Sequence, residues 1–142
     1  MSLTRALTSG AVGALTVTAL NEGIRRIYPH APRMEVIGMR AIAAALRGMD
    51  IDPPTSRTLY YVTLVGDLLG NTLYYSLAGN GRNSSWGRGI GLGLAAGIGG
   101  AFLPRPLGLG SQPRQRFPIT HLLTIAWYLA GGIAATAAAR RT

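Results

Sequence analysis

Four stretches of apolar and small residues, interrupted by few charges, run through this chain of 142 residues. They cover residues 6–27, 58–78, 86–103 and 119–139. Each approaches the roughly 20 residues that an α-helix needs to cross the hydrocarbon core of a bilayer. The pattern predicts an all-α integral membrane protein, a four-helix bundle that forms a single transmembrane domain over residues 1–142.

The composition also favours a membrane protein. Only 13% of the residues are charged, against about 25% in soluble domains. Most of the 20 glycines lie within the apolar stretches rather than in polar linkers, a placement that transmembrane helices tolerate. The net charge of +9 comes from arginines that flank the apolar stretches. This placement does not favour a nucleic-acid surface and indicates a bilayer with anionic head groups as the partner.

A fifth helix of a different kind is expected over residues 34–49, between the first two spans. At 100° per residue, apolar side chains gather on one face, and Arg33, Arg40 and Arg47 gather on another. Such a helix either lies in the membrane interface with its arginines toward lipid head groups, or packs on the bundle from the aqueous side. Glu35 falls on the apolar side of this helix, in its first turn, where the positive end of the helix dipole stabilises a carboxylate.

The arginines near the spans predict the orientation. One face of the membrane has nine (Arg25, Arg26, Arg33, Arg40, Arg47, Arg57, Arg105, Arg114 and Arg116), and the other has five (Arg5, Arg82, Arg88, Arg140 and Arg141). Cytoplasmic loops carry the excess of positive charge. Both termini are therefore expected outside the cell, in the periplasm of a bacterium, with the two long loops in the cytoplasm.

Glycines at four-residue spacing predict where helices pack closely. Gly89, Gly93 and Gly97 form a strip on the third span, and Gly66 and Gly70 form a shorter one on the second. A face without side chains lets another backbone approach closely. The partner is either another helix of the same chain or a second copy in a homo-oligomer.

Polar residues at membrane depth are the candidate functional site. Asp67 lies near the centre of the second span, in line with Thr63 and Asn71. At 1.5 Å per residue, Asp67 lies about 15 Å from the cytoplasmic end of its helix, Glu22 about 7 Å, His121 about 3 Å and Asn71 about 21 Å. If their helices are neighbours, these residues form a series of polar groups suited to moving protons or a small cation.

Each of these groups also has a structural interpretation. Glu22 precedes Arg25 and Arg26 by three and four residues, the spacing of an ion pair on a helix. His121 is placed to form a hydrogen bond at the interface, and Asp67 to be a protonated acid bonded to a neighbour. Tyrosines mark the two ends of the second span and are expected in interfacial belts: Tyr60, Tyr61, Tyr74 and Tyr75.

Enzymatic motifs are weak in this sequence. Cysteine is absent, there are only two histidines, and no serine lies in a nucleophile-elbow pattern, so neither catalysis nor a metal or cofactor is predicted. In a general way the chain resembles small four-span inner-membrane proteins of bacteria, which implies that location and no functional residue. We expect transport of protons, ions or small solutes; the alternative is an accessory or assembly subunit of a larger membrane complex.

Overall fold

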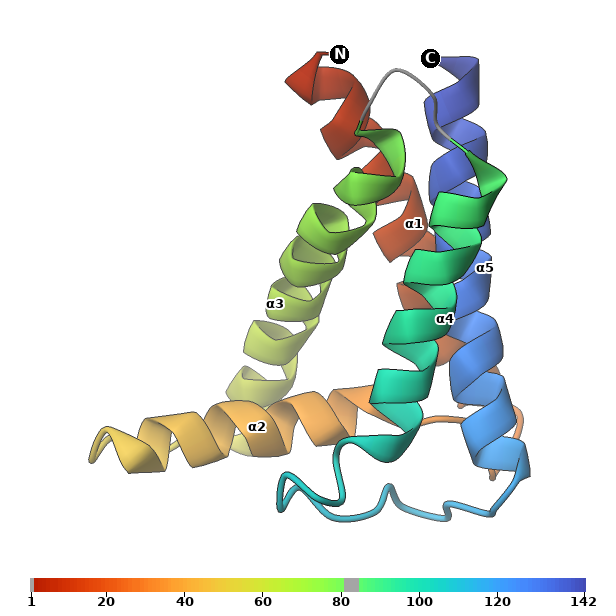
Figure 1. Ribbon diagram of the computed structural model, residues 1–142. Helices are drawn as coiled ribbons and strands as arrows, with labels where there is room; N and C mark the ends of the chain where they lie inside the picture. The colour runs from red at the N-terminus through yellow and green to blue at the C-terminus, as the bar shows by residue number, and fades with distance from the viewer. Residues whose placement is uncertain (1, 81–84) are drawn as a thin grey trace.

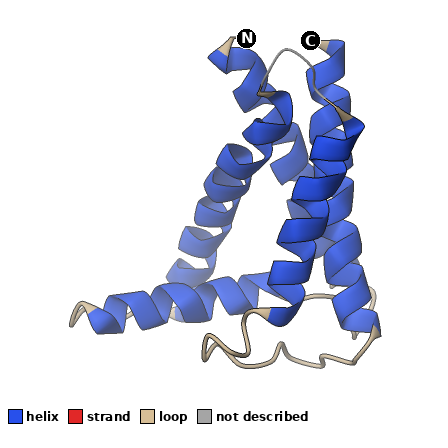
Figure 2. Cartoon of the chain, viewed as in Figure 1, coloured by secondary structure: helices blue, strands red, loops and turns tan. Residues whose placement is uncertain are grey.

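The computed structural model describes residues 2–80 and 85–142, and over these residues it contains helices and no strands (Figures 1 and 2). Five α-helices and one short 3-10 helix follow one another along the described chain: α1 Leu3–Ile24, α2 Met34–Gly48, α3 Ser56–Ser76, η1 Leu77–Gly79, α4 Trp86–Phe102 and α5 Ile119–Arg141. The all-α prediction is confirmed. Arg82, which entered the expected charge balance, lies outside the described residues.

The ends of the helices follow local capping. Helix α1 begins at Leu3, three residues before the expected start, because the Ser2 side chain accepts a hydrogen bond of 3.3 Å from the backbone N–H of Arg5. Thr55 and Ser85 cap α3 and α4 in the same way. After α1 the chain turns through Tyr28 and Pro29, where a proline disfavours continued helix.

Four helices, α1, α3, α4 and α5, run along the long axis of the molecule, and the two termini lie at the same end of it (Figure 1). Arg5 near the start of α1 donates a 2.9 Å hydrogen bond from Nε to the carbonyl oxygen of Ala139 near the end of α5. Helix α2 crosses the opposite end and projects away from the other helices, and the loop between α4 and α5 lies at that end too (Figure 1). The elements that hold most of the arginines therefore share one end of the molecule.

The glycine strip of α4 packs on α5 within the same chain. A Cβ atom built on Gly93 would lie 2.7 Å from both the Leu129 Cα and the Tyr128 carbonyl oxygen, and one built on Gly97 would lie 2.7 Å from the Ile125 Cα. At Gly89 it would meet Thr136 and Gly132. All three glycines are buried. Of the two expected partners, a helix of the same chain is the one that this strip contacts.

The strip on α3 does not take part in packing within the chain. Built Cβ atoms on Gly66 and Gly70 would meet nothing within 4 Å, so the structure does not bring these two residues to a neighbouring helix. Other glycines make the close contacts between α1, α3 and α5 instead. Gly13 of α1 approaches Tyr75 and the Gly131 carbonyl oxygen, each 2.9 Å from a built Cβ.

The core lies where these three helices meet. Val17, Tyr75, Ala78 and Ala135 form a buried apolar cluster. Its side chains are mostly small, which allows the backbones of α1, α3 and α5 to approach one another closely.

Helix α2 packs on α3 through Gly38, where a built Cβ would lie 2.6 Å from the Thr63 methyl group. Two of the three arginines that were expected to face lipid form hydrogen bonds within the chain. Arg33 donates to the Glu35 carboxylate, and Arg40 donates to the carbonyl oxygens of Leu109 (2.9 Å) and Ser111 (2.7 Å). Arg47 alone of the three is exposed without a partner among the described residues. The lipid-facing role of these three arginines stays a prediction.

Two helices of the described chain, α1 and α5, are long and apolar enough to cross a membrane. The same criteria do not select α3 or α4. Helix α4 has 17 residues, a rise of about 25 Å at 1.5 Å per residue, which is less than the roughly 30 Å of a bilayer core. Helix α3 is long enough, but Asp67 and Asn71 lower its hydropathy.

Candidate functional site

Most of the polar residues that the sequence predicts at membrane depth line a small gap between α1, α2, α3 and α5. We call it the acidic gap; its polar lining consists of Thr18, Asn21, Glu22, Glu35, Asp67, Asn71 and Tyr128. Its volume is about 20 Å³, which is room for about one water molecule. The structure thus brings Asp67, Asn71 and Glu22 together, as their expected depths and neighbouring helices require.

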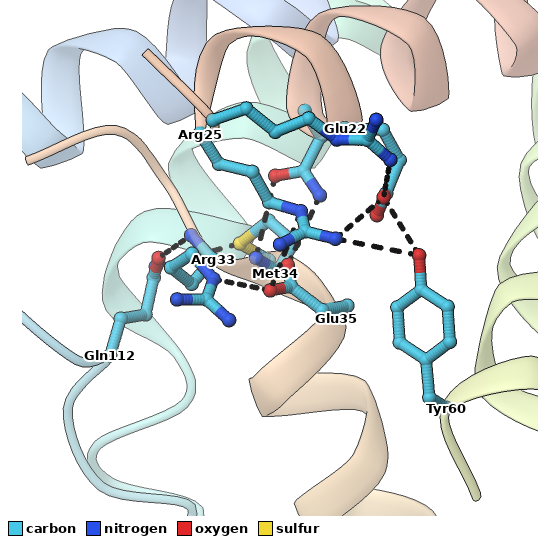
Figure 3. A network of polar contacts seen from close by, with 9 residues as sticks. Glu22, Arg25, Arg33, Met34, Glu35, Tyr60 and Gln112 are labelled. Carbon is cyan, nitrogen blue, oxygen red and sulfur yellow. Dashed lines mark hydrogen bonds and ion pairs between the residues drawn. The ribbon is translucent and has the colours of Figure 1, made fainter. Parts of the chain in front are cut away.

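Glu35 holds the centre of a polar network at this gap (Figure 3). The residue is 4% exposed. Asn21 Nδ2 donates to Oε2 at 3.2 Å, Arg33 donates to Oε1, and Arg25 Nε lies 3.8 Å from the same oxygen. A buried carboxylate is tolerated when it is paired with opposite charge and hydrogen-bonded. Helix α2 is attached to the end of α1 by this carboxylate.

Glu22 forms the second half of the network (Figure 3). Arg25 Nη2 and the Tyr60 hydroxyl each donate to Glu22 Oε2 at 2.7 Å, and Arg26 lies 3.9 Å from that oxygen. Arg25 follows the last residue of α1, and its hydrogen bond to Glu22 raises the pKa of its guanidinium. The ion pair that the sequence spacing indicates is therefore present, and Tyr60 links it to α3.

Asp67 differs from the two glutamates because it forms no ion pair with any described residue. It is half-buried and faces α2, where a Cβ built on Gly38 would lie 3.6 Å from Oδ2. A carboxylate in this position lacks the cation that would hold it charged, so it is the acid of the gap best suited to gain and lose a proton.

Thr63 lies on the same side of α3 but outside the gap. It is 1% exposed, its methyl group faces Gly38, and its Oγ1 is buried without a hydrogen-bond partner among the described residues. Thr63 therefore serves the contact between α2 and α3.

His121 is not part of the acidic gap. Its ring lies between Phe102 and Phe117, with centroid distances of 5.0 and 5.2 Å, and it lines a different pocket at the α4–α5 loop. His121 is the third residue of α5, whereas Asp67 lies near the middle of α3, and the two side chains line different pockets. The predicted series of four polar residues is therefore assembled without its histidine.

The sequence did not indicate Asn21, Glu35 or Tyr60 as parts of this site, and it indicated Arg25 only as an ion-pair partner of Glu22. One signal was present, because Glu35 falls on the apolar side of α2, where an acid is expected to face protein. In the described part of the chain, no group of three or more His, Asp or Glu side chains is arranged to hold a metal ion. Comparison of the chain with family models, with curated proteins and with solved structures gave no match.

Proposed function

We propose that the chain is a four-span protein of the bacterial inner membrane that moves protons or small cations, with Asp67 as the group that binds and releases them. Helices α1, α3, α4 and α5 are the four spans. Helix α2 lies at the cytoplasmic interface, at the end where most of the arginines are found, and both termini are periplasmic.

The distribution of side chains supports four spans. Large aliphatic residues lie exposed on the outer faces of α3 and α4 as well as α1 and α5, among them Leu69 at 62% and Ile98 at 50% exposed. Hydroxyl groups lie inside, such as those of Thr124 and Thr136. A helix bundle in lipid has apolar side chains on its outer surface and small or polar side chains between its helices.

The single observation on which the transport proposal rests is the position of Asp67 in the acidic gap. Two other acids, Glu22 and Glu35, line the same gap but are held by arginines. A water molecule in about 20 Å³ would connect Asp67 to these groups, and acids joined by water form proton relays. The same volume is too small for an organic solute, which favours protons or small cations over solutes.

Reconstitution of the full chain into liposomes with a fluorescent reporter of internal pH or of cations tests this proposal. Asp67→Asn keeps the shape of the side chain and removes its titration, so we expect it to fold and to lose flux. Asp52→Asn is the matched control, because Asp52 is exposed in the connection between α2 and α3. Absence of flux in the parent protein, or full flux in the Asp67→Asn variant, would contradict the proposal.

A second candidate function, an accessory or assembly subunit, is favoured by the free glycine strip on α3. Gly66 and Gly70 are exposed beside Val65 and Leu69, and a partner helix would meet no side chain of this protein at these glycines. A second copy or another membrane subunit fits there. Cross-linking of the protein in native membranes at Gly66→Cys would distinguish this function, because a subunit cross-links at this position even where no flux is found.

A further inference from the structure

A pocket at the α4–α5 loop is left unexplained by proton movement. It has a volume of about 260 Å³ and lies between the end of α4, the start of α5, α2 and the loop itself. We call it the loop pocket. Its polar side chains include Arg105, Ser111, Gln115 and His121, and its apolar wall includes Phe102 and Phe117.

The polar side chains of the loop pocket offer hydrogen-bond donors. Gln115 uses its side-chain oxygen to accept from the Gln112 N–H at 3.2 Å, which leaves its amide N–H groups. The Gln112 side-chain oxygen is likewise taken, by the N–H of Arg33. Arg105 and the His121 ring form no hydrogen bond with any described residue, and because His121 Nδ1 is buried, Nε2 is the ring nitrogen that a ligand can reach. Carboxylates do not line this pocket, so a ligand rich in acceptors fits it best.

The charge of the loop pocket is positive. Arg105 carries a full charge, and His121 is the third residue of α5, where the N-terminal end of a helix has the positive end of its dipole. Guanidinium groups, amide N–H groups and helix N-termini together are the usual groups that bind phosphate. The volume is below the roughly 300–1,000 Å³ of pockets for drug-sized ligands, which limits the ligand to a head group or a small ion.

We propose that the loop pocket binds a phosphate group, with Arg105 as its principal contact and His121 and Gln115 as further donors. The phosphate is carried by a phospholipid head group or is free in solution. The surroundings favour lipid, because exposed apolar side chains flank the pocket: Leu103 at 55%, Leu107 at 69% and Phe117 at 71% exposed. This site does not depend on the transport proposal, since it shares no residue with the acidic gap.

The test uses the full chain, stripped of lipid in a neutral detergent. In one arm, inorganic phosphate is titrated and followed by calorimetry. In the other arm, the protein is placed in nanodiscs of phosphatidylcholine with or without phosphatidic acid, and retained lipid is measured by native mass spectrometry. We expect Arg105→Gln to raise the dissociation constant about tenfold for whichever of the two ligands binds the pocket. One charged hydrogen bond is lost in this variant, and its loss has an effect of about this size.

Two further variants make the result decisive. Arg114→Gln removes the same charge from the same loop without touching the pocket, so it should bind as the parent does. His121→Phe keeps a ring between Phe102 and Phe117 and should weaken binding. Binding of phosphatidic acid alone identifies a head-group site, and binding of inorganic phosphate identifies a site for the free ion. Absence of binding in both arms, or equal loss from Arg105→Gln and Arg114→Gln, would overturn the proposal.

Discussion

Glu35 is the acid most completely removed from solvent among those of the acidic gap. Its carboxylate accepts from Asn21 of α1 and from Arg33 beside it, and lies within 3.8 Å of Arg25. Removal of such a charge leaves its cationic partners without compensation in a poorly solvated place. Glu35 therefore stabilises the connection of α2 to α1 whether or not the protein transports anything.

We expect Glu35→Gln to lower the free energy of unfolding by about 2 kcal/mol, since the amide keeps one acceptor and loses the charge that Arg25 and Arg33 face. Thermal unfolding of the purified protein in detergent measures this loss. Asp52→Asn removes an exposed charge and should unfold at the temperature of the parent protein. Equal unfolding temperatures for both variants and the parent would show that the network does not contribute to stability.

The tyrosines of α3 serve a role that differs from the expected interfacial belt. Tyr60 donates to Glu22, Tyr74 donates to the Leu92 carbonyl oxygen and Tyr75 to the Tyr128 carbonyl oxygen, the last two at 2.7 Å. Tyr75 is completely buried. Only Tyr61, which is 54% exposed, has the exposure of a belt residue. The belt interpretation is wrong for Tyr75, because its buried hydroxyl finds a partner on a neighbouring helix, which sequence position does not show.

At the scale of the helices, small residues determine which neighbours are close. Helix α4 contacts α5 along Gly89, Gly93 and Gly97, and Gly132 of α5 faces Gly89 in return. Side chains on these faces would separate the two backbones and remove the dispersion contacts between them. Gly87 and Gly91 of the same helix meet nothing within 4 Å.

Gly93→Leu should therefore disrupt the α4–α5 contact and lower the free energy of unfolding by about 3 kcal/mol, because the new side chain would overlap the Leu129 backbone. Gly91→Leu is the control on the same helix, since a Cβ at Gly91 meets nothing within 4 Å. Denaturation in detergent compares the two variants. Similar stability of both would mean that α4 and α5 are not packed through this strip.

At the scale of the whole molecule, the common position of the two termini is the feature most relevant to topology (Figure 1). An even number of spans returns the chain to the side on which it began, and the end with α2 and the α4–α5 loop then faces the other side. Helices α1 and α5 are antiparallel, and the hydrogen bond from Arg5 to Ala139 joins the start of α1 to the end of α5.

Single cysteines test this arrangement, because the natural chain has none. A membrane-impermeant thiol reagent added to intact cells should label Thr142→Cys and should not label Ser111→Cys until the cells are opened. The excess of arginines at the α2 end predicts this direction. Labelling of both positions from the same side would contradict four spans, and exchange of the two results would reverse the orientation.

The sequence by itself determined the positions of the helices and the all-α class. Apolar runs, capping residues such as Ser85 and the proline after α1 act over a few neighbouring residues, so they can be read along the chain. The sequence also indicated Asp67, Asn71 and Glu22 as polar residues that must face protein, since lipid does not accommodate them.

Only the tertiary structure decided which of these groups meet. Asp67 and His121 were both expected in one series of polar groups, yet Asp67 lines the acidic gap and His121 lies between two phenylalanines. Gly66 and Gly93 have the same spacing pattern, yet only Gly93 contacts another backbone. The reason is physical: a helix forms from local interactions, whereas its neighbours depend on how every helix is rotated and ordered in the bundle.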